Sequence, residues 1–128
     1  MDLPNRDTLK NEQHLTKPGQ YAIVYDRGRS WANNLLVLKA LPNGLPFSRY
    51  GFSVSKRIGS AVKRNRVKRR LREVLRTTPL QPGWDLVFIA RSPISVAQYA
   101  AVKQSVENLL SRASLAARNY EEISPGTN

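Results

Sequence analysis

The stretch from Lys56 to Arg76, KRIGSAVKRNRVKRRLREVLR, combines a helical apolar period with a high density of positive charge. Ten of its twenty-one positions are Lys or Arg, and Glu73 is its only acidic residue. The chain of 128 residues has 21 basic and 9 acidic residues, so 11 basic and 8 acidic residues lie outside this stretch, and without it the formal charge falls from +12 to +3. The basicity is therefore local, which indicates a site for a polyanion.

A helical wheel divides this stretch into two sides. With Val67 as reference, Leu71, Val74 and Leu75 fall within roughly 80° of it, which predicts a buried stripe. The opposite side and its flanks carry polar and basic residues, namely Asn65, Arg66, Lys68, Arg69, Arg70, Arg72 and Arg76. Repulsion between these cations costs an isolated helix a few tenths of a kcal/mol for each i,i+4 pair, roughly. A negatively charged partner would offset that cost.

Nucleic acid is the partner that this pattern favours. A helix face that is merely solvated usually mixes the two signs of charge, and this one does not. Arginine binds phosphate with two parallel hydrogen bonds, which suits a phosphate backbone. An anionic membrane is less favoured, because the opposite face is needed for the core and contains no Trp or Phe. A DNA-reading helix is less favoured because no helix-turn-helix partner or heptad repeat accompanies it.

Composition predicts one folded domain at 15–115, between a flexible polar arm at 1–14 and a frayed tail at 116–128. Hydrophobic residues make up 41% of the chain and aromatic residues 8%, which is ordinary for a folded protein. The chain contains no cysteine, which favours a reducing, cytoplasmic setting. No segment approaches the roughly 18 apolar residues of a membrane span, so no membrane partner is expected.

The remaining elements are expected from local patterns. Strands are predicted at 35–41, 49–55 and 84–90, with a small strand around Trp31. The last main strand is almost continuously apolar, which favours an interior position. A short helix is expected from about Thr16 to Gly28. A long helix is expected to begin at Ser95, which has capping-box spacing to Gln98, and to bury a stripe of Tyr99, Val102, Val106, Leu109, Leu110 and Ala113. This αβββαβα order predicts an α+β fold, with helices covering a mixed central sheet.

Catalysis by the protein itself is not expected. Metal-free ribonucleases need a paired acid and base, and the chain has one histidine, His14. A two-metal nuclease would need clustered carboxylates, but the nine acidic residues are scattered. Glu73, surrounded by arginines, is expected to form an intrahelical salt bridge. We therefore expect no catalytic residue and no metal ligand in this chain.

The string GFSVSKRIGSAVKRNRVKRRLRE, residues 51–73, resembles the signature of the bacterial ribonuclease P protein subunit. The resemblance extends over about 15–113, through LTKPGQYAIVYDRGRSWANNLLVLKAL before the signature and PGWDLVFIARSPISVAQYAAVKQSVENLL after it. It implies a small α/β sandwich with an uncommon left-handed βαβ crossover through the basic helix. It also implies an accessory subunit of a ribonucleoprotein that removes the 5′ leader of precursor tRNA.

In the family that this chain resembles, the RNA subunit carries the catalysis and holds the magnesium ions. The resemblance thus implies a catalytic RNA and precursor tRNA as partners, no obligate protein partner, and no metal bound tightly by the protein. Six residues match the signature positions expected to contact the catalytic RNA, namely Arg64, Asn65, Arg66, Lys68, Arg69 and Arg72. A general RNA-binding, ribosomal or RNA-chaperone protein without a nuclease partner is the alternative.

A second set of residues is expected at the cleft for the single-stranded leader. Its members are Tyr21, Tyr25, Lys39, Ser53, Lys56 and Arg57. The two tyrosines match aromatic positions of the family, and stacking of a base on such a ring is worth about 1–3 kcal/mol. Simple core packing of the two rings is the alternative. Lys39 stands where relatives can carry an aromatic residue, so we expect a phosphate contact there.

Overall fold

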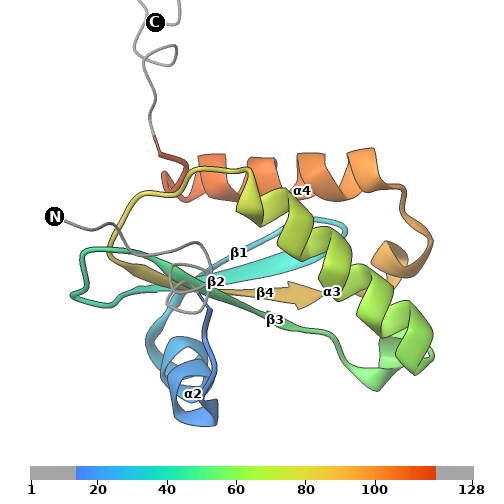
Figure 1. The fold of residues 1–128 in the computed structure, drawn as a ribbon, viewed down its shortest axis with the longest axis horizontal. Coiled ribbons are helices and arrows are strands. Elements are labelled where there is room, and N and C mark those ends of the chain that lie inside the picture. Colours follow the sequence, from blue (N-terminus) through green and yellow to red (C-terminus); the bar gives the residue numbers. More distant parts are fainter. Residues whose placement is uncertain (1–13, 118–128) are drawn as a thin grey trace, which may run out of the picture.

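A computed structural model describes residues 14–117 of the chain (Figure 1). A four-stranded sheet lies between helices α3 and α4 on one face and helix α2 on the other. The main elements are α2 (Pro18–Arg27), β1 (Arg29–Ala32), β2 (Leu36–Pro42), β3 (Arg49–Ser53), α3 (Ala61–Arg76), β4 (Trp84–Ala90) and α4 (Tyr99–Arg112). Two 3-10 helices, η1 (Lys56–Ile58) and η2 (Ser92–Val96), precede α3 and α4. The predicted α+β class and αβββαβα order are confirmed.

Strand β4 lies inside the sheet, as its apolar sequence predicted, in the strand order β1-β2-β4-β3. Strands β1 and β4 both pair antiparallel with β2, whereas β3 pairs parallel with β4. Parallel neighbours need a long connection, and α3 provides it. The sheet is therefore mixed, as predicted, and the left-handed sense of this crossover stays a prediction.

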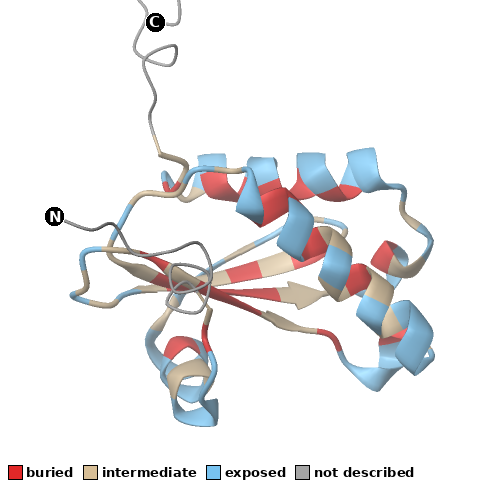
Figure 2. Ribbon diagram, in the orientation of Figure 1, coloured by how far each residue is buried: buried red, intermediate tan, exposed pale blue. Residues whose placement is uncertain are grey.

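The main core lies between the sheet and helices α3 and α4 (Figure 2). Alternate residues of β2 and β4 point into it, and Leu36, Leu38 and Phe88 are fully buried there. The two helices contribute apolar residues at helical spacing, namely Val67, Leu71, Val74 and Leu75 from α3 and Val102, Val106, Leu109 and Leu110 from α4. Each such side chain stabilises the fold by about 1.5–3 kcal/mol.

A smaller apolar cluster holds α2 against the opposite face of the sheet. Val24 of α2 is fully buried against Val87 of β4 and Leu15. Tyr21 packs at the border of this cluster. The single buried residue of α2 fixes the helix on the sheet while leaving most of its surface in solvent.

A polar junction ties the β1–β2 hairpin to α4. The side-chain oxygen of Asn33 accepts hydrogen bonds from the backbone N–H groups of Leu35 and Leu36 and from the Ser105 hydroxyl, at 2.7–3.2 Å. Its amide group donates to the Ser105 carbonyl at 3.0 Å. This network links the hairpin directly to α4.

The predicted start of the last helix at Ser95 is wrong. Ser95 belongs to η2, whose first turn contains Pro93, and the backbone is extended at Ala97 before α4 begins with Gln98 as its N-cap. Ile94 is 1% exposed, so η2 is anchored by its own buried residue. Tyr99, expected in the buried stripe, is 39% exposed. The capping-box spacing is overridden here by tertiary packing.

The folded part extends slightly beyond 15–115 at both ends. His14 forms a parallel bridge with Tyr50, and Leu15 donates its N–H to the Tyr50 carbonyl at 2.9 Å. At the other end, Ala116 forms an antiparallel bridge with Leu80. The rest of the expected N-terminal arm, 1–13, and of the expected tail, 118–128, lies outside the described residues.

Candidate nucleic-acid interface

Helix α3 begins directly after the turn that follows β3. Ser60 is its N-cap, and the Ser60 hydroxyl accepts a hydrogen bond from the Lys63 N–H at 3.3 Å. Gly59 has a φ of 143°, which other residues rarely adopt. This turn brings η1, with the exposed Lys56 and Arg57, beside the start of the basic helix.

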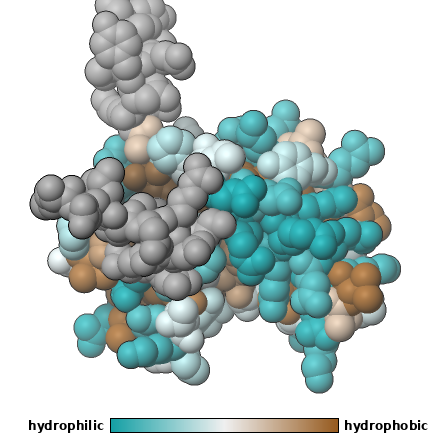
Figure 3. All heavy atoms as spheres, in the orientation of Figure 1, coloured by the Kyte–Doolittle hydropathy of each residue, from teal (hydrophilic) through white to brown (hydrophobic). Residues whose placement is uncertain are grey.

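The inner side of α3 fixes the direction of its charged side. Val67, Leu71, Val74 and Leu75 are the buried residues of this helix, as the wheel predicted. Because these positions face the core, the basic residues between them are forced outward. A hydrophilic patch covers the solvent side of α3 in the space-filling view (Figure 3).

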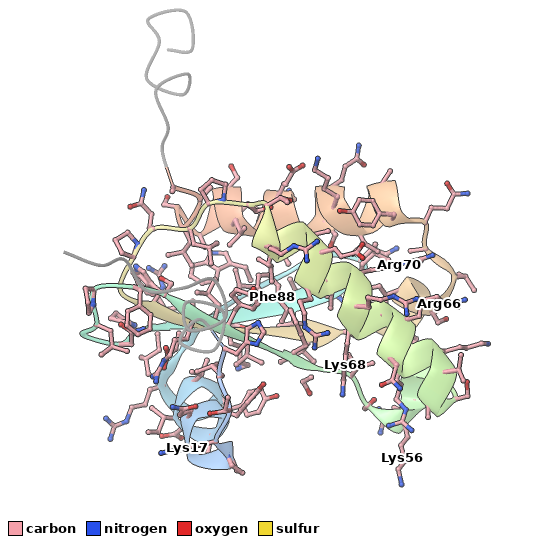
Figure 4. The ribbon with its side chains drawn as sticks, in the orientation of Figure 1. Lys17, Lys56, Arg66, Lys68, Arg70 and Phe88 are labelled. Atoms are coloured by element: carbon pink, nitrogen blue, oxygen red, sulfur yellow. The ribbon has the colours of Figure 1, made fainter. Side chains whose placement is uncertain are left out.

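The two flanks of α3 differ in their surroundings (Figure 4). On one flank Arg66 and Arg70 point toward η2, and Arg70 donates to the Ala97 carbonyl at 2.7 Å. On the other flank Lys68 points toward the side of the sheet that carries α2. Arg70 therefore holds the segment between η2 and α4, whereas Lys68 points away from that segment.

The remaining residues of the predicted RNA-contacting set lie on the outer side of α3. Asn65, Arg69 and Arg72 are exposed, and Arg64 is half-buried because its Nε donates to the Gly59 carbonyl at 3.2 Å. The expected salt bridge of Glu73 is wrong, since no ion pair of Glu73 occurs within 14–117. The positive charge of this surface is thus not neutralised by the helix itself.

Asp85, the acidic residue in strand β4, is already paired. Asp85 accepts from the Arg49 guanidinium at 2.8 and 2.7 Å and from the Asn43 amide at 2.9 Å. The hydrogen bond to Asp85 raises the pKa of Arg49, and burial of the guanidinium opposes this effect. Asp85 is 6% exposed, so this carboxylate serves the fold and does not reduce the charge of α3.

Tyr21 of α2 lies over β3 at a position where the strand has no side chain. A Cβ on Gly51 would lie 2.6 Å from the Tyr21 Cζ, so the ring occupies the space that glycine leaves open. The Tyr21 hydroxyl donates to the Leu15 carbonyl at 3.4 Å, and burial raises the pKa of this phenol. Tyr21 is therefore half-buried and packed against the small apolar cluster, and its stacking with a leader base stays a prediction.

A pocket of about 210 Å³ opens beside this ring, at the outer edge of β3, where 14–16 also line it. Tyr21 and Phe52 line it from α2 and the strand, and Lys68 and Arg72 line it from α3. Aromatic rings and two cations thus face one space, an arrangement that suits a nucleotide with its base and phosphate. An isolated glycine in an alternating strand, here Gly51, is the sequence signal that could have indicated this close approach.

The other predicted cleft residues lie around this pocket without lining it. Tyr25, one turn after Tyr21, is 39% exposed. Lys39 lies in the same sheet row as Gly51, two strands away, at about 10 Å between backbones. Ser53 ends β3 on the same face and leads toward η1. The structure therefore brings Tyr21 and Lys68 together and leaves Lys39 apart from them.

The described part of the chain offers no compact set of metal donors. Within 14–117, no group of three or more His, Cys, Asp or Glu residues lies close enough to hold an ion. None of the helices described in that range has the length and apolar character needed to cross a bilayer.

Comparison with known proteins agrees with this geometry. A family model described as Ribonuclease P matches residues 9–114. The chain is 45% identical over 116 residues to the ribonuclease P protein component of Dehalococcoides mccartyi strain CBDB1, a match that covers 91% of this chain and 97% of that protein. It is 44% identical over 110 residues to the protein of the same name from Caldanaerobacter subterraneus, covering 84% and 91%.

Two solved structures share the fold. The RNase P protein of Staphylococcus aureus has a TM-score of 0.75 and 30% identity, covering 82% of this chain and 98% of that one. The RNase P protein of Thermotoga maritima has a TM-score of 0.68 and 31% identity, covering 72% and 89%. With the family model spanning nearly all of the described residues, these similarities show that the chain belongs to the ribonuclease P protein family.

Proposed function

We propose that this protein binds the catalytic RNA of ribonuclease P through the outer surface of α3 and the 5′ leader of precursor tRNA through the cleft beside Tyr21, acting in the cytoplasm. As a member of its family, the chain is a protein component of the endoribonuclease that matures the 5′ end of tRNA. One observation carries the proposal: a cationic helix surface, on which Glu73 is the single acidic residue, continues into a pocket lined by aromatic rings.

The two proposed RNA surfaces meet along α3. Arg64, Asn65, Arg66 and Arg69 supply the contacts to the catalytic RNA, and guanidinium groups provide paired donors to its phosphates. Lys68 and Arg72 were predicted for the same RNA, and in addition they line the pocket beside Tyr21. We infer that these two cations lie between the catalytic RNA and the leader.

The leader surface comprises Tyr21, Tyr25, Lys39, Ser53, Lys56 and Arg57. Stacking on Tyr21 and Tyr25 tolerates any base, as a processor of many precursors requires. Lys39, Lys56 and Arg57 are proposed to contact leader phosphates, and such contacts do not depend on the leader sequence.

Magnesium is proposed to be held by the RNA. The donor set of the described residues does not fit a tight magnesium site, because no three acidic or histidine side chains lie together within 14–117. The role of the protein is then electrostatic: its cations lower the repulsion between two RNA molecules that are both negatively charged.

Charge reversal at the signature tests the proposal. Arg64→Glu combined with Arg66→Glu should abolish assembly with the cognate catalytic RNA at physiological magnesium. The control, Arg27→Glu with Lys103→Glu, makes the same change in net charge at exposed positions on α2 and α4 and should assemble normally. Unchanged assembly and precursor cleavage by a folded Arg64→Glu/Arg66→Glu variant would contradict the proposal.

Two further readouts separate this function from general RNA binding. Affinity should fall steeply with salt, with a log–log slope of about 0.7–0.9 for each neutralised phosphate. The purified protein should stimulate precursor cleavage by the catalytic RNA. Strand annealing without such stimulation would favour the RNA-chaperone alternative.

A further inference from the structure

A second pocket continues the groove between β3 and α3 beyond the leader cleft. It measures about 370 Å³ and lies between the β2–β3 loop and the chain that leaves α3. Tyr50 lines both this pocket and the 210 Å³ pocket beside Tyr21. The two cavities are therefore neighbours along one groove, and Tyr50 separates them.

One row of cations follows this groove. Lys68 and Arg72 line the first pocket and Arg76 lines the second, so successive members are four residues apart on α3. Four residues correspond to a rise of about 6 Å, and the three side chains therefore project from one side of the helix. Burial raises the pKa of Tyr50, and the positive charges of Arg72 and Arg76 oppose this effect, which agrees with both arginines lining pockets that Tyr50 also lines.

Rings and polar side chains together line the second pocket. Phe47, Pro79 and Pro82 contribute rings to its lining, and no acidic residue contributes to it. A volume of this size is at the lower end of the range for small-molecule sites, about 300–1,000 Å³. Such a space, with a guanidinium at its rim, suits a planar ring that carries a negative charge.

The end of α3 would normally oppose a phosphate at this place, because the last carbonyls of a helix carry partial negative charge. Here the hydroxyls of Thr77 and Thr78 satisfy one of these carbonyls. The Thr77 and Thr78 hydroxyls donate to the Val74 carbonyl at 3.2 and 2.6 Å. The Arg76 side chain makes no hydrogen bond or ion pair to any residue within 14–117, so its guanidinium is available to an external anion.

We propose that this second pocket, hereafter the Phe47 pocket, receives the base of an unpaired RNA nucleotide whose phosphate lies on Arg76. The inference rests on the proposed RNA-binding function and extends it, since it adds a subsite at the far end of α3 from η1. The row of Lys68, Arg72 and Arg76 then follows successive phosphates of one single strand. Charge complementarity along the groove favours RNA over a peptide or a second copy of this chain.

Two variants test the pocket in the reconstituted holoenzyme. Phe47→Ala removes the stacking ring and should weaken RNA affinity by about 5- to 150-fold, the range expected for one stacked base. Phe47→Tyr keeps a ring and should retain affinity. Arg76→Gln, at an exposed position, should weaken affinity and reduce the salt slope by about 0.7–0.9 without unfolding the protein.

Two titrations and a crosslink identify which RNA supplies the nucleotide. Each variant is titrated with catalytic RNA alone and, as holoenzyme, with precursor tRNA. A benzophenone side chain at position 47 should crosslink to an unpaired nucleotide of whichever RNA shows the loss. Native affinity of folded Phe47→Ala and Arg76→Gln for both RNAs would overturn the inference, as would a change of oligomeric state in Phe47→Ala by sedimentation.

The same experiment separates this inference from the function on which it rests. Arg64→Glu/Arg66→Glu is measured in parallel. If that variant loses assembly while the two pocket variants bind normally, the Phe47 pocket is not an RNA subsite and the proposed function stands. If that variant also assembles normally, the proposed function itself fails.

Discussion

Replacing Gly51 with alanine tests how β3 and α2 together shape the leader cleft. A Cβ at this position would lie 2.6 Å from the Tyr21 Cζ and 2.9 Å from its Cε2, much closer than side-chain atoms approach one another in folded proteins. Either the ring moves off the strand or the strand shifts, and overpacking of this kind costs about 1–3 kcal/mol. We expect the free energy of unfolding to fall by that amount in chemical denaturation.

The same substitution should weaken leader binding. A displaced Tyr21 ring no longer forms the wall of the pocket, so a stacked base loses a contact worth about 1–3 kcal/mol. This corresponds to an increase in Kd of about 5- to 150-fold. The assay compares the affinity of the holoenzyme for precursor tRNA with its affinity for mature tRNA, which has no leader. Only the affinity for the precursor should fall.

A double-mutant cycle isolates the contact. In a Tyr21→Ala background the new Cβ meets no ring, so Gly51→Ala should cost much less stability and leader affinity than in the native chain. Gly19→Ala is the matched control, because a Cβ there meets nothing within 4 Å, and it should leave leader affinity unchanged. Equal costs of Gly51→Ala with and without the Tyr21 ring would refute this reasoning.

Three other predictions concern stability and ionisation. Arg70→Ala should lower the free energy of unfolding by about 1.5–3 kcal/mol, because it removes the charged donor that binds the Ala97 carbonyl before α4. Arg69→Ala, at an exposed position, should weaken RNA binding without changing stability. Thermal unfolding and RNA titration measure the two effects, and the reverse pattern would contradict both roles. Burial raises the pKa of Tyr21 above 10.0, so Tyr21→Phe should remove a late step from the tyrosinate absorbance titration. The folded state favours the neutral phenol, so stability from this group is present below about pH 10 and is lost as pH rises further. Asn33→Ala should cost about 1–3 kcal/mol, because it leaves the Ser105 hydroxyl and two backbone donors without their acceptor, and RNA affinity of the folded variant should stay unchanged.

The parts of the structure that depend on local periodicity could be predicted from the sequence. The buried stripe of α3 follows from the spacing of Val67, Leu71, Val74 and Leu75, and burial at those positions alone turns the arginines outward. The interior position of β4 follows from its continuous apolar run, since only a strand covered on both faces tolerates one.

The features that depend on contacts distant in sequence could not be predicted. Ser95 and Gln98 have the spacing of a capping box, but the bond from Arg70 to the Ala97 carbonyl and the burial of Ile94 favour a separate 3-10 turn. The intrahelical pairing expected for Glu73 ignored the alternative of leaving a surface carboxylate in water, where an exposed ion pair gains little. The position of Tyr21 over Gly51 likewise depends on how α2 docks on the sheet.

Cleavage of precursor tRNA by the cognate catalytic RNA at low magnesium, with and without this protein, tests the central claim most directly. The account predicts that the protein raises both the cleavage rate and the affinity for precursor tRNA, that the gain depends on the leader, and that Arg64→Glu/Arg66→Glu fails to supply it. A cleavage rate and a precursor affinity that do not change when the native protein is added would contradict the account.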